Sequence, residues 1–164
     1  MPRLPFDPID EAARQWALHW QGVPQMHAVT SLMRVQQLVL GRLDGILKPH
    51  GLTFARYEAL VLLCFSSRGS LPQGKMGERL QVHPTSITSI VQRLEADGLV
   101  TRRPHPDDGR AILAEITDAG RAVVERATAD LVGAGFALGA LGDDQLAELS
   151  TLLTPVRRAA GDFE

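Results

Sequence analysis

The residues best suited to a chemical role lie in one stretch, 84–110, which combines short hydroxyl side chains with arginines. Helical spacing over 84–97 places a polar set on one face, namely Thr85, Ser86, Thr88, Ser89, Gln92 and Arg93. Short side chains let a helix approach the base edges in the major groove of DNA, while Gln92 and Arg93 reach further. Taken alone, the pattern also fits a helical hairpin within an all-α protein.

A basic hairpin is predicted directly after this helix. Residues 99–103 and 111–116 have the composition of two strands, and the two prolines, two aspartates and glycine between them indicate a loop over 104–110. Arg102, Arg103 and Arg110 flank that loop, and cations on a protruding ribbon can enter a minor groove or lie on phosphates. Because a lone hairpin is marginally stable, it must lean on the preceding helices, as the wing of a winged helix does.

Other kinds of site find little support in the sequence. Cys64 is the single cysteine, so it forms no internal disulfide, and its place between Leu63 and Phe65 favours a buried, inert thiol over a redox sensor. The five histidines lack ligand spacing, so we expect no metal and no cofactor.

We do not expect an enzyme, because no glycine-rich loop follows a strand and no room remains for a catalytic domain. Winged helices also serve as dimerisation modules of methyltransferases. A winged helix used only for protein contacts is a further alternative, and it predicts no salt-dependent binding to duplex DNA.

The overall charge argues against a nucleic-acid partner until it is divided along the chain. The 164 residues are 45% hydrophobic and carry a net charge of -2. Segment 68–110 has seven basic and five acidic residues, whereas segment 111–164 has four and nine. The mildly basic middle is therefore the part that could meet phosphates. With no long apolar span and no signal peptide in the sequence, we expect a cytoplasmic protein.

Apolar periodicity predicts five helices around the short helix-turn-helix, at 8–21, 25–48, 54–66, 118–138 and from about 143 onward. Three residues are suited to cap helix starts: Asp7, Thr53 and Thr117. Ser70 and Gln73 have the spacing of a capping box for a helix ending near Leu80. Pro155 should kink or end the last helix.

The predicted fold is mainly α with a small β-hairpin, a winged helix-turn-helix with dimerisation helices at both ends. Residues 1–24 form an N-terminal extension helix, and residues 25–164 form the winged-helix domain. Its DNA-binding lobe spans about 54–116, flanked by dimerisation helices at 25–48 and 118–160. The lobe is small for covering four further apolar faces, which favours a homodimer suited to palindromic DNA. The alternative is that the terminal helices fold back on their own core.

The residues around the hairpin resemble the signature of the MarR family of transcriptional regulators. The resemblance rests on segment 80–103, on Pro106-Asp-Asp-Gly-Arg110 and on Glu115-Ile-Thr-Asp-Ala-Gly120, within a match over residues 27–157. It implies a homodimeric regulator, a repressor, that leaves its pseudo-palindromic operator when a small aromatic or phenolic molecule binds. It also implies that Asp108 orients an arginine and that Arg110 touches DNA. Gly109 departs from the many relatives that carry a second arginine there.

Segment 7–16 resembles the extra helix of the urate-responsive MarR branch, which implies a purine-like effector. The residues that match such a pocket are Trp16 for stacking, Asp44 for ring N–H groups, and Arg79 and Arg93 for carbonyls. A ligand at Arg93 would rotate the recognition helix and change the half-site spacing. The alternative is that Trp16 and Trp20 are helix-packing aromatics and that Asp44 and Arg93 form an internal ion pair.

Overall fold

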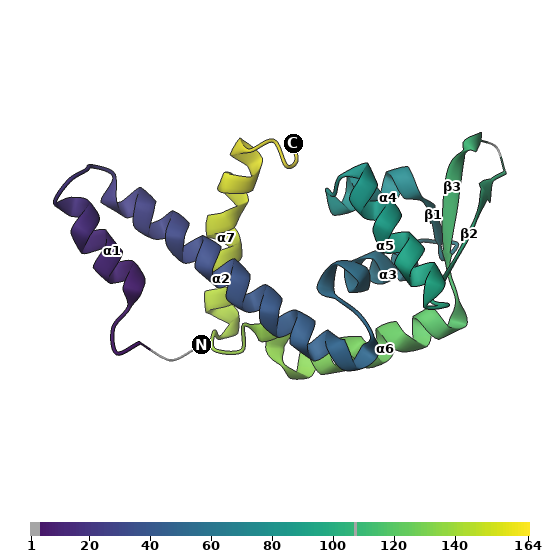
Figure 1. Ribbon diagram of the computed structural model, residues 1–164, viewed down its shortest axis with the longest axis horizontal. Helices are drawn as coiled ribbons and strands as arrows, with labels where there is room; N and C mark the ends of the chain where they lie inside the picture. The colour runs from purple at the N-terminus through teal and green to yellow at the C-terminus, as the bar shows by residue number, and fades with distance from the viewer. Residues whose placement is uncertain (1–3, 107) are drawn as a thin grey trace.

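A computed structural model describes residues 4–106 and 108–164, except for the side chains of 108–110. It shows a mainly helical chain with a small antiparallel sheet, and so confirms the predicted winged helix-turn-helix with helices at both ends (Figure 1). The elements are α1 (Pro8–Ala17), α2 (Val23–Leu47), η1 (Lys48–His50), α3 (Phe54–Phe65), β1 (Ser70–Pro72), α4 (Gln73–Leu80), α5 (Pro84–Ala96), β2 (Val100–His105), β3 (Asp108–Ile116), α6 (Asp118–Gly133), η2 (Gly135–Ala137) and α7 (Asp143–Ala159).

Three helices start at the residues that the sequence predicts as caps. The side chains of Asp7, Thr53 and Thr117 each accept a hydrogen bond from a backbone N–H in the first turn of α1, α3 and α6. Such bonds satisfy N–H groups that lack a partner within the helix. Local sequence therefore determines where these helices begin.

The predicted capping box of Ser70 and Gln73 is wrong, because Ser70 belongs to a third strand. Strand β1 pairs antiparallel with β3, with Ser70 opposite Glu115, and the sheet order is β1-β3-β2. Helix α4 then begins directly after the strand, with Pro72 at its cap position and no side-chain capping bond. Residues 70–72 thus form a strand because they pair with the open edge of β3, although three residues are too few to show strand periodicity in the sequence.

The hairpin is also longer than predicted. Strand β2 continues to His105 and β3 begins at Asp108, with an irregularity in register at Pro104 and His105. The expected loop over 104–110 is therefore mostly strand. Proline is tolerated in β2 because β2 lies at the edge of the sheet and has no neighbour on one side.

Two expectations for the last helices are also corrected. Helix α6 ends at Gly133 rather than near 138, and Phe136 beyond it has a left-handed backbone with φ of 48°. Helix α7 continues through Pro155 to Ala159 instead of kinking or ending there. Pro155 lies on an exposed part of α7, where water can satisfy the carbonyl that loses its N–H partner.

The buried core joins the C-terminal half of α2 to α3, α5, α6 and the sheet. Its largest fully buried side chains are Leu47, Leu60, Leu63, Met76, Ile87, Val91, Leu94, Val100 and Leu131. Helix α1 packs mainly on α2, and α7 makes at most slight contact with other described elements. Figure 1 shows α1 and the first half of α2 extending away from the lobe of α3, α4, α5 and the sheet.

Gly120 in the first turn of α6 is packed so closely that it has no room for a side chain. A Cβ atom there would overlap the carbonyl oxygen of Leu99 and lie 2.8 Å from Cγ1 of Ile116. We expect Gly120→Ala to lower the free energy of unfolding by about 1–3 kcal/mol, because backbone and core must shift to admit the methyl group. Urea denaturation followed by circular dichroism measures this change.

Gly133→Ala in the same helix is the matched control, because among the described residues no atom beyond its chain neighbours and the adjoining helix backbone lies within 4 Å of the added Cβ. This substitution should leave stability unchanged or raise it by up to about 1 kcal/mol. A Gly120→Ala protein as stable as the Gly133→Ala protein would contradict the packing argument.

Candidate nucleic-acid interface

Helix α5 divides into a buried and an exposed face, as its sequence predicts. Ile87, Val91 and Leu94 are buried. The outward face carries the six predicted side chains, all exposed: Thr85, Ser86, Thr88, Ser89, Gln92 and Arg93. The structure therefore brings all six together on one surface of one helix.

The start of α5 is defined by the turn that precedes it. Gln81 ends α4 in a left-handed conformation with φ of 53°, and this makes the chain reverse sharply. His83 then caps α5, its Nδ1 accepting from the N–H of Thr85 at 3.3 Å, and Pro84 takes the first helical position. This is a helix-turn-helix whose second helix is capped and exposed, as an entrant into the major groove must be.

The hydroxyl side chains keep the outer face of α5 slender. Thr88 donates through Oγ1 to the carbonyl oxygen of Pro84 at 2.9 Å, so its side chain lies along the helix. A shallow depression on this face is lined by Pro84, Thr85, Thr88, Ser89 and Gln92. A surface of this shape admits close approach of base edges and sugar-phosphate atoms.

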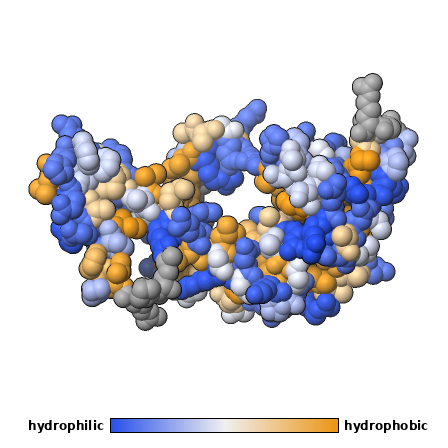
Figure 2. Space-filling view, viewed as in Figure 1, coloured by the Kyte–Doolittle hydropathy of each residue, from blue (hydrophilic) through white to orange (hydrophobic). Residues whose placement is uncertain are grey.

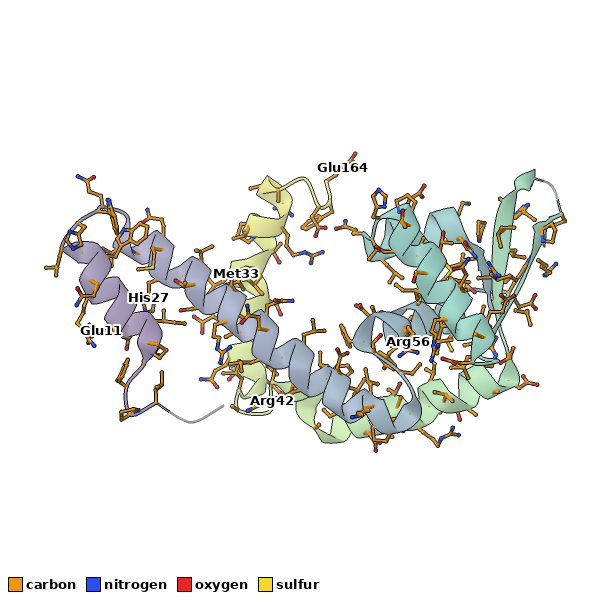
Figure 3. The ribbon with its side chains drawn as sticks, viewed as in Figure 1. Glu11, His27, Met33, Arg42, Arg56 and Glu164 are labelled. Atoms are coloured by element: carbon orange, nitrogen blue, oxygen red, sulfur yellow. The ribbon has the colours of Figure 1, made fainter. Side chains whose placement is uncertain are left out.

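The C-terminal end of α5 is fixed by a carboxylate between two arginines. Oδ2 of Asp97 accepts from Nη1 of Arg56 at 3.2 Å and lies 3.5 Å from Nε of Arg93. Arg56 comes from α3 and is largely covered, so the pair anchors α5 to the helix beneath it (Figure 3). The Arg93 side chain itself stays 67% exposed. Asp97 and Arg56 escaped the sequence analysis, because 41 residues separate them along the chain.

Arg102 and Arg103, both predicted to contact DNA, are held by carboxylates of this chain. Nε and Nη2 of Arg102 bind Oε2 of Glu95 at 2.7 and 2.6 Å. Nε and Nη2 of Arg103 bind Oε2 of Glu115 at 3.0 and 2.9 Å. The first pair joins β2 to α5, and the second lies within the sheet.

The hydrogen bond from Arg102 lowers the pKa of the Glu95 carboxyl below its ordinary 4.5. The stabilisation from this pair is therefore complete above pH 4.5, and it is lost as the pH falls through the lowered pKa. The ion pair between α5 and the wing is thus intact at neutral pH.

Two predicted residues of the wing, Asp108 and Arg110, have side chains outside the described part of the structure. Their backbone lies in β3, opposite β2. Their assignments as an orienting carboxylate and a DNA-contacting arginine stay predictions.

The four residues predicted for a purine pocket are not brought together within one chain. Trp16 donates through Nε1 to the carbonyl oxygen of Gln21 at 2.8 Å, and its ring lies 4.8 Å from that of Trp20, as in helix packing. Asp44 accepts from the N–H of Phe54 at 2.7 Å. Figure 1 shows α1 at the opposite end of the molecule from α4 and α5.

The two arginines of this set both lie in the helix-turn-helix. Arg79 is exposed on α4. Arg93 pairs with Asp97, so the alternative of an internal Asp44–Arg93 ion pair is wrong.

Cys64 lies half-buried in α3. Burial raises the pKa of its thiol above the ordinary 9.0, Glu125 adds to this, and the nearby Arg121 guanidinium opposes it. The thiolate, which is the reactive form, is therefore disfavoured at neutral pH. Over residues 4–106 and 108–164 no group of three or more His, Cys, Asp or Glu side chains could hold a metal ion. In the same residues no helix has the length and apolar character to cross a membrane.

Comparisons with known proteins agree on one family. The sequence model of the MarR family matches residues 55–112. Sco5413 from Streptomyces coelicolor, a MarR family transcriptional regulator, is 57% identical in sequence. Its crystal structure aligns with 87% of this chain and 99% of the Sco5413 chain, with a TM-score of 0.81. The organic hydroperoxide resistance transcriptional regulator of Bacillus subtilis (strain 168) is 31% identical over 102 residues, which cover 62% of this chain and 67% of that protein.

CouR from Rhodococcus jostii RHA1 is similar in two solved states. The CouR chain bound to p-coumaroyl-CoA is 29% identical in sequence. The alignment covers 76% of this chain and 87% of the CouR chain, with a TM-score of 0.65. The transcriptional repressor CouR bound to a 23-mer DNA duplex is 26% identical in sequence. The alignment covers 77% of this chain and 89% of the CouR chain, with a TM-score of 0.70.

Proposed function

The chain belongs to the MarR family of DNA-binding transcriptional regulators, which are not enzymes, and we propose that it acts as a homodimeric repressor released from its operator by a small molecule. The operator is pseudo-palindromic, because two α5 helices related by a two-fold axis contact two equivalent half-sites. Of the alternatives, a module used only for protein contacts is the one that a DNA-binding experiment excludes.

The observation that carries the proposal is the exposed face of α5. It gathers four short hydroxyl side chains with Gln92 and Arg93, directly before a two-stranded wing. CouR, whose fold is similar, has been solved on a DNA duplex. In the proposal α5 lies in the major groove, where Gln92 and Arg93 contact bases, and the wing adds Arg110 in the minor groove or on a phosphate. Asp108 orients an arginine of the wing.

Replacing Arg110 tests the role of the wing. We expect Arg110→Ala to weaken operator binding and to flatten the slope of log affinity against log salt by about 1.8, because the dimer loses one phosphate contact, worth about 0.9, from each chain. Fluorescence anisotropy measures both, on a duplex that the wild-type protein selects from a random-sequence pool. Arg126→Ala, an exposed arginine on α6, is the matched control and should leave the slope unchanged. An unaltered slope in Arg110→Ala would refute the contact.

The proposed dimer is supported by apolar side chains that one chain leaves uncovered on α2 and α7 (Figure 2). They are Val29, Leu32, Met33, Val35, Leu38, Leu40, Leu152 and Val156, and Figure 3 shows Met33 on the part of α2 that extends from the lobe. Because α7 has so little contact within its own chain, a second copy is the partner that both helices fit.

Sedimentation velocity at micromolar concentration should give about twice the 17.8 kDa chain mass. Replacing both Leu152 and Val156 by Asp should yield monomers, because charges at a buried apolar contact are costly. Phe65→Ser removes an aromatic side chain that is 83% exposed outside α2 and α7, and should leave the dimer intact. A monomeric wild-type protein would contradict the proposed assembly.

An effector of the aromatic-anion class is proposed from CouR, which has been solved with p-coumaroyl-CoA. A urate-like purine is the finer proposal. Since α1, which carries Trp16, lies at the opposite end of the chain from α5, which carries Arg93, such a site requires a second chain to supply the tryptophan. Isothermal titration of the protein with urate or xanthine should release heat, and the same ligand should dissociate the selected duplex. Trp16→Ala should abolish both effects, whereas no heat at millimolar ligand would exclude the purine.

A further inference from the structure

We infer that Arg102 is a positioning residue, whose ion pair with Glu95 sets the wing at a fixed angle to α5, and that it does not itself contact DNA. The inference rests on the proposed function, because it takes α5 and the wing to face the same duplex. It reassigns an arginine that the sequence places among the DNA contacts.

The geometry of the pair is that of a clamp between two elements. Glu95 lies in the last turn of α5, and Arg102 is the third residue of β2. Nε of Arg102 donates to Oε2 of Glu95 at 2.7 Å, and Nη2 lies 2.6 Å from the same oxygen. Two guanidinium nitrogens within ion-pair distance of one oxygen restrict rotation of the guanidinium more than a single contact does.

The pair is also sheltered compared with an ordinary surface pair. The side chains of Arg102 and Glu95 are 32% and 35% exposed, whereas those of Arg14 and Glu11 on α1 are 66% and 42% exposed. Partial exclusion of water strengthens the attraction and lessens its screening by salt. In the part of the chain that the structure describes, no other ion pair joins α5 to the sheet.

The Arg102–Glu95 pair restricts the movement of β2 relative to α5, which the backbone connection between them does not restrict fully. Between α5 and β2 the chain turns through Gly98, whose φ of 73° is left-handed, and the N–H of Leu99 donates to the carbonyl of Leu94 at 2.9 Å. Strand β3 is held further by β1, which pairs with it as far as Leu113, opposite Arg103 of β2. Strand β2 lies at the other edge of the sheet, where the Arg102–Glu95 pair joins it directly to α5 and so fixes how this edge of the wing lies against the helix.

A paired guanidinium is also poorly placed to bind phosphate. Its two donors on this side are already bound, and the Glu95 carboxylate beside it repels an anion. If Arg102 were a DNA contact, Glu95 would therefore be a competitor, and removing its charge would strengthen binding. If Arg102 positions the wing, removing that charge weakens binding, because the wing must then be ordered when DNA binds. The two roles predict effects of opposite sign.

The experiment measures affinity and its salt dependence by anisotropy, using full-length dimeric protein and the duplex selected by the wild type. We expect Glu95→Gln and Arg102→Ala each to weaken binding about three- to tenfold, with the salt slope unchanged. The double variant should bind no more weakly than Arg102→Ala, because both changes remove one interaction. Glu11→Gln is the matched control, since it removes a carboxylate that pairs with Arg14 on α1, away from α5 and the wing, and it should alter affinity less than twofold.

Arg102→Lys keeps the charge and separates the roles without deleting the side chain. A phosphate contact tolerates lysine, whereas a forked pair with one carboxylate oxygen does not, so we expect Arg102→Lys to weaken binding like Arg102→Ala. Thermal melting identifies any variant that fails to fold, and the Glu95→Gln and Arg102→Lys proteins carry the test if Arg102→Ala is one of them.

The inference is overturned if Glu95→Gln binds as tightly as the wild type or more tightly. It is equally overturned if Arg102→Ala flattens the salt slope of the dimer by about 1.8, as loss of one phosphate contact from each chain does. A wild-type protein with no salt-dependent binding to any duplex of the pool would instead reject the proposed function, and the inference with it.

Discussion

The structure depends on the burial of one face of α5. Ile87, Val91 and Leu94 are within a few percent of complete burial, against a core that includes Leu60 and Leu63 of α3. Burying each such side chain contributes about 1.5–3 kcal/mol, so α5 has one rotational setting about its axis. The 3.6-residue period then leaves the residues between them outside. The polar surface that faces away from the core is therefore a consequence of the packing. The burial of these three side chains determines which way every side chain proposed to contact a base points.

A second constraint ties the start of α6 to the connection between α5 and β2. The carbonyl of Leu99 accepts from the N–H of Thr117 at 3.1 Å, and Oγ1 of Thr117 donates to the carbonyl of Gly98 at 2.9 Å. The first turn of α6 is thereby bonded to the connection between α5 and the wing. Farther along, α6 is bonded to η1 through His50 and Asp130 at 2.7 Å, and to α3 through Tyr57 and Thr128 at 2.8 Å. A rotation of α6 cannot leave the base of the wing unmoved, because Gly120 packs directly on the Leu99 backbone. Through these contacts a movement of α6 would displace the connection between α5 and the wing, and with it the C-terminal end of α5.

Local physics explains which parts of this structure could be predicted from the sequence. Caps at Asp7, Thr53 and Thr117 act within one turn, and the apolar period of α5 spans three turns, so both are visible along the chain. Strand β1 has only three residues and exists because β3 offers a free edge, which no local pattern records. The run of α7 through Pro155 depends on solvent exposure there, again a tertiary property. The purine set failed to assemble in one chain for the same reason: spacing places Trp16 and Arg93 on helices, but it says nothing of the distance between those helices.

The charge distribution gains its meaning only when ion pairs are taken into account. Segment 68–110 has a basic surplus of two, yet Arg93, Arg102 and Arg103 each have a carboxylate neighbour, and Arg56 beneath them is bound to Asp97. Arg68, Lys75 and Arg79 are exposed and enter no ion pair within the described residues, so only half of the six described cations of this segment are free to attract phosphates from a distance. A chain of net charge -2 with its lobe so neutralised gains little from non-specific electrostatic attraction. Its affinity for DNA must then come from close contact along α5 and from a wing that is already in position. These contributions differ between one DNA sequence and another. Internal pairing of arginines thus lowers the affinity for random DNA without lowering the contribution that distinguishes an operator.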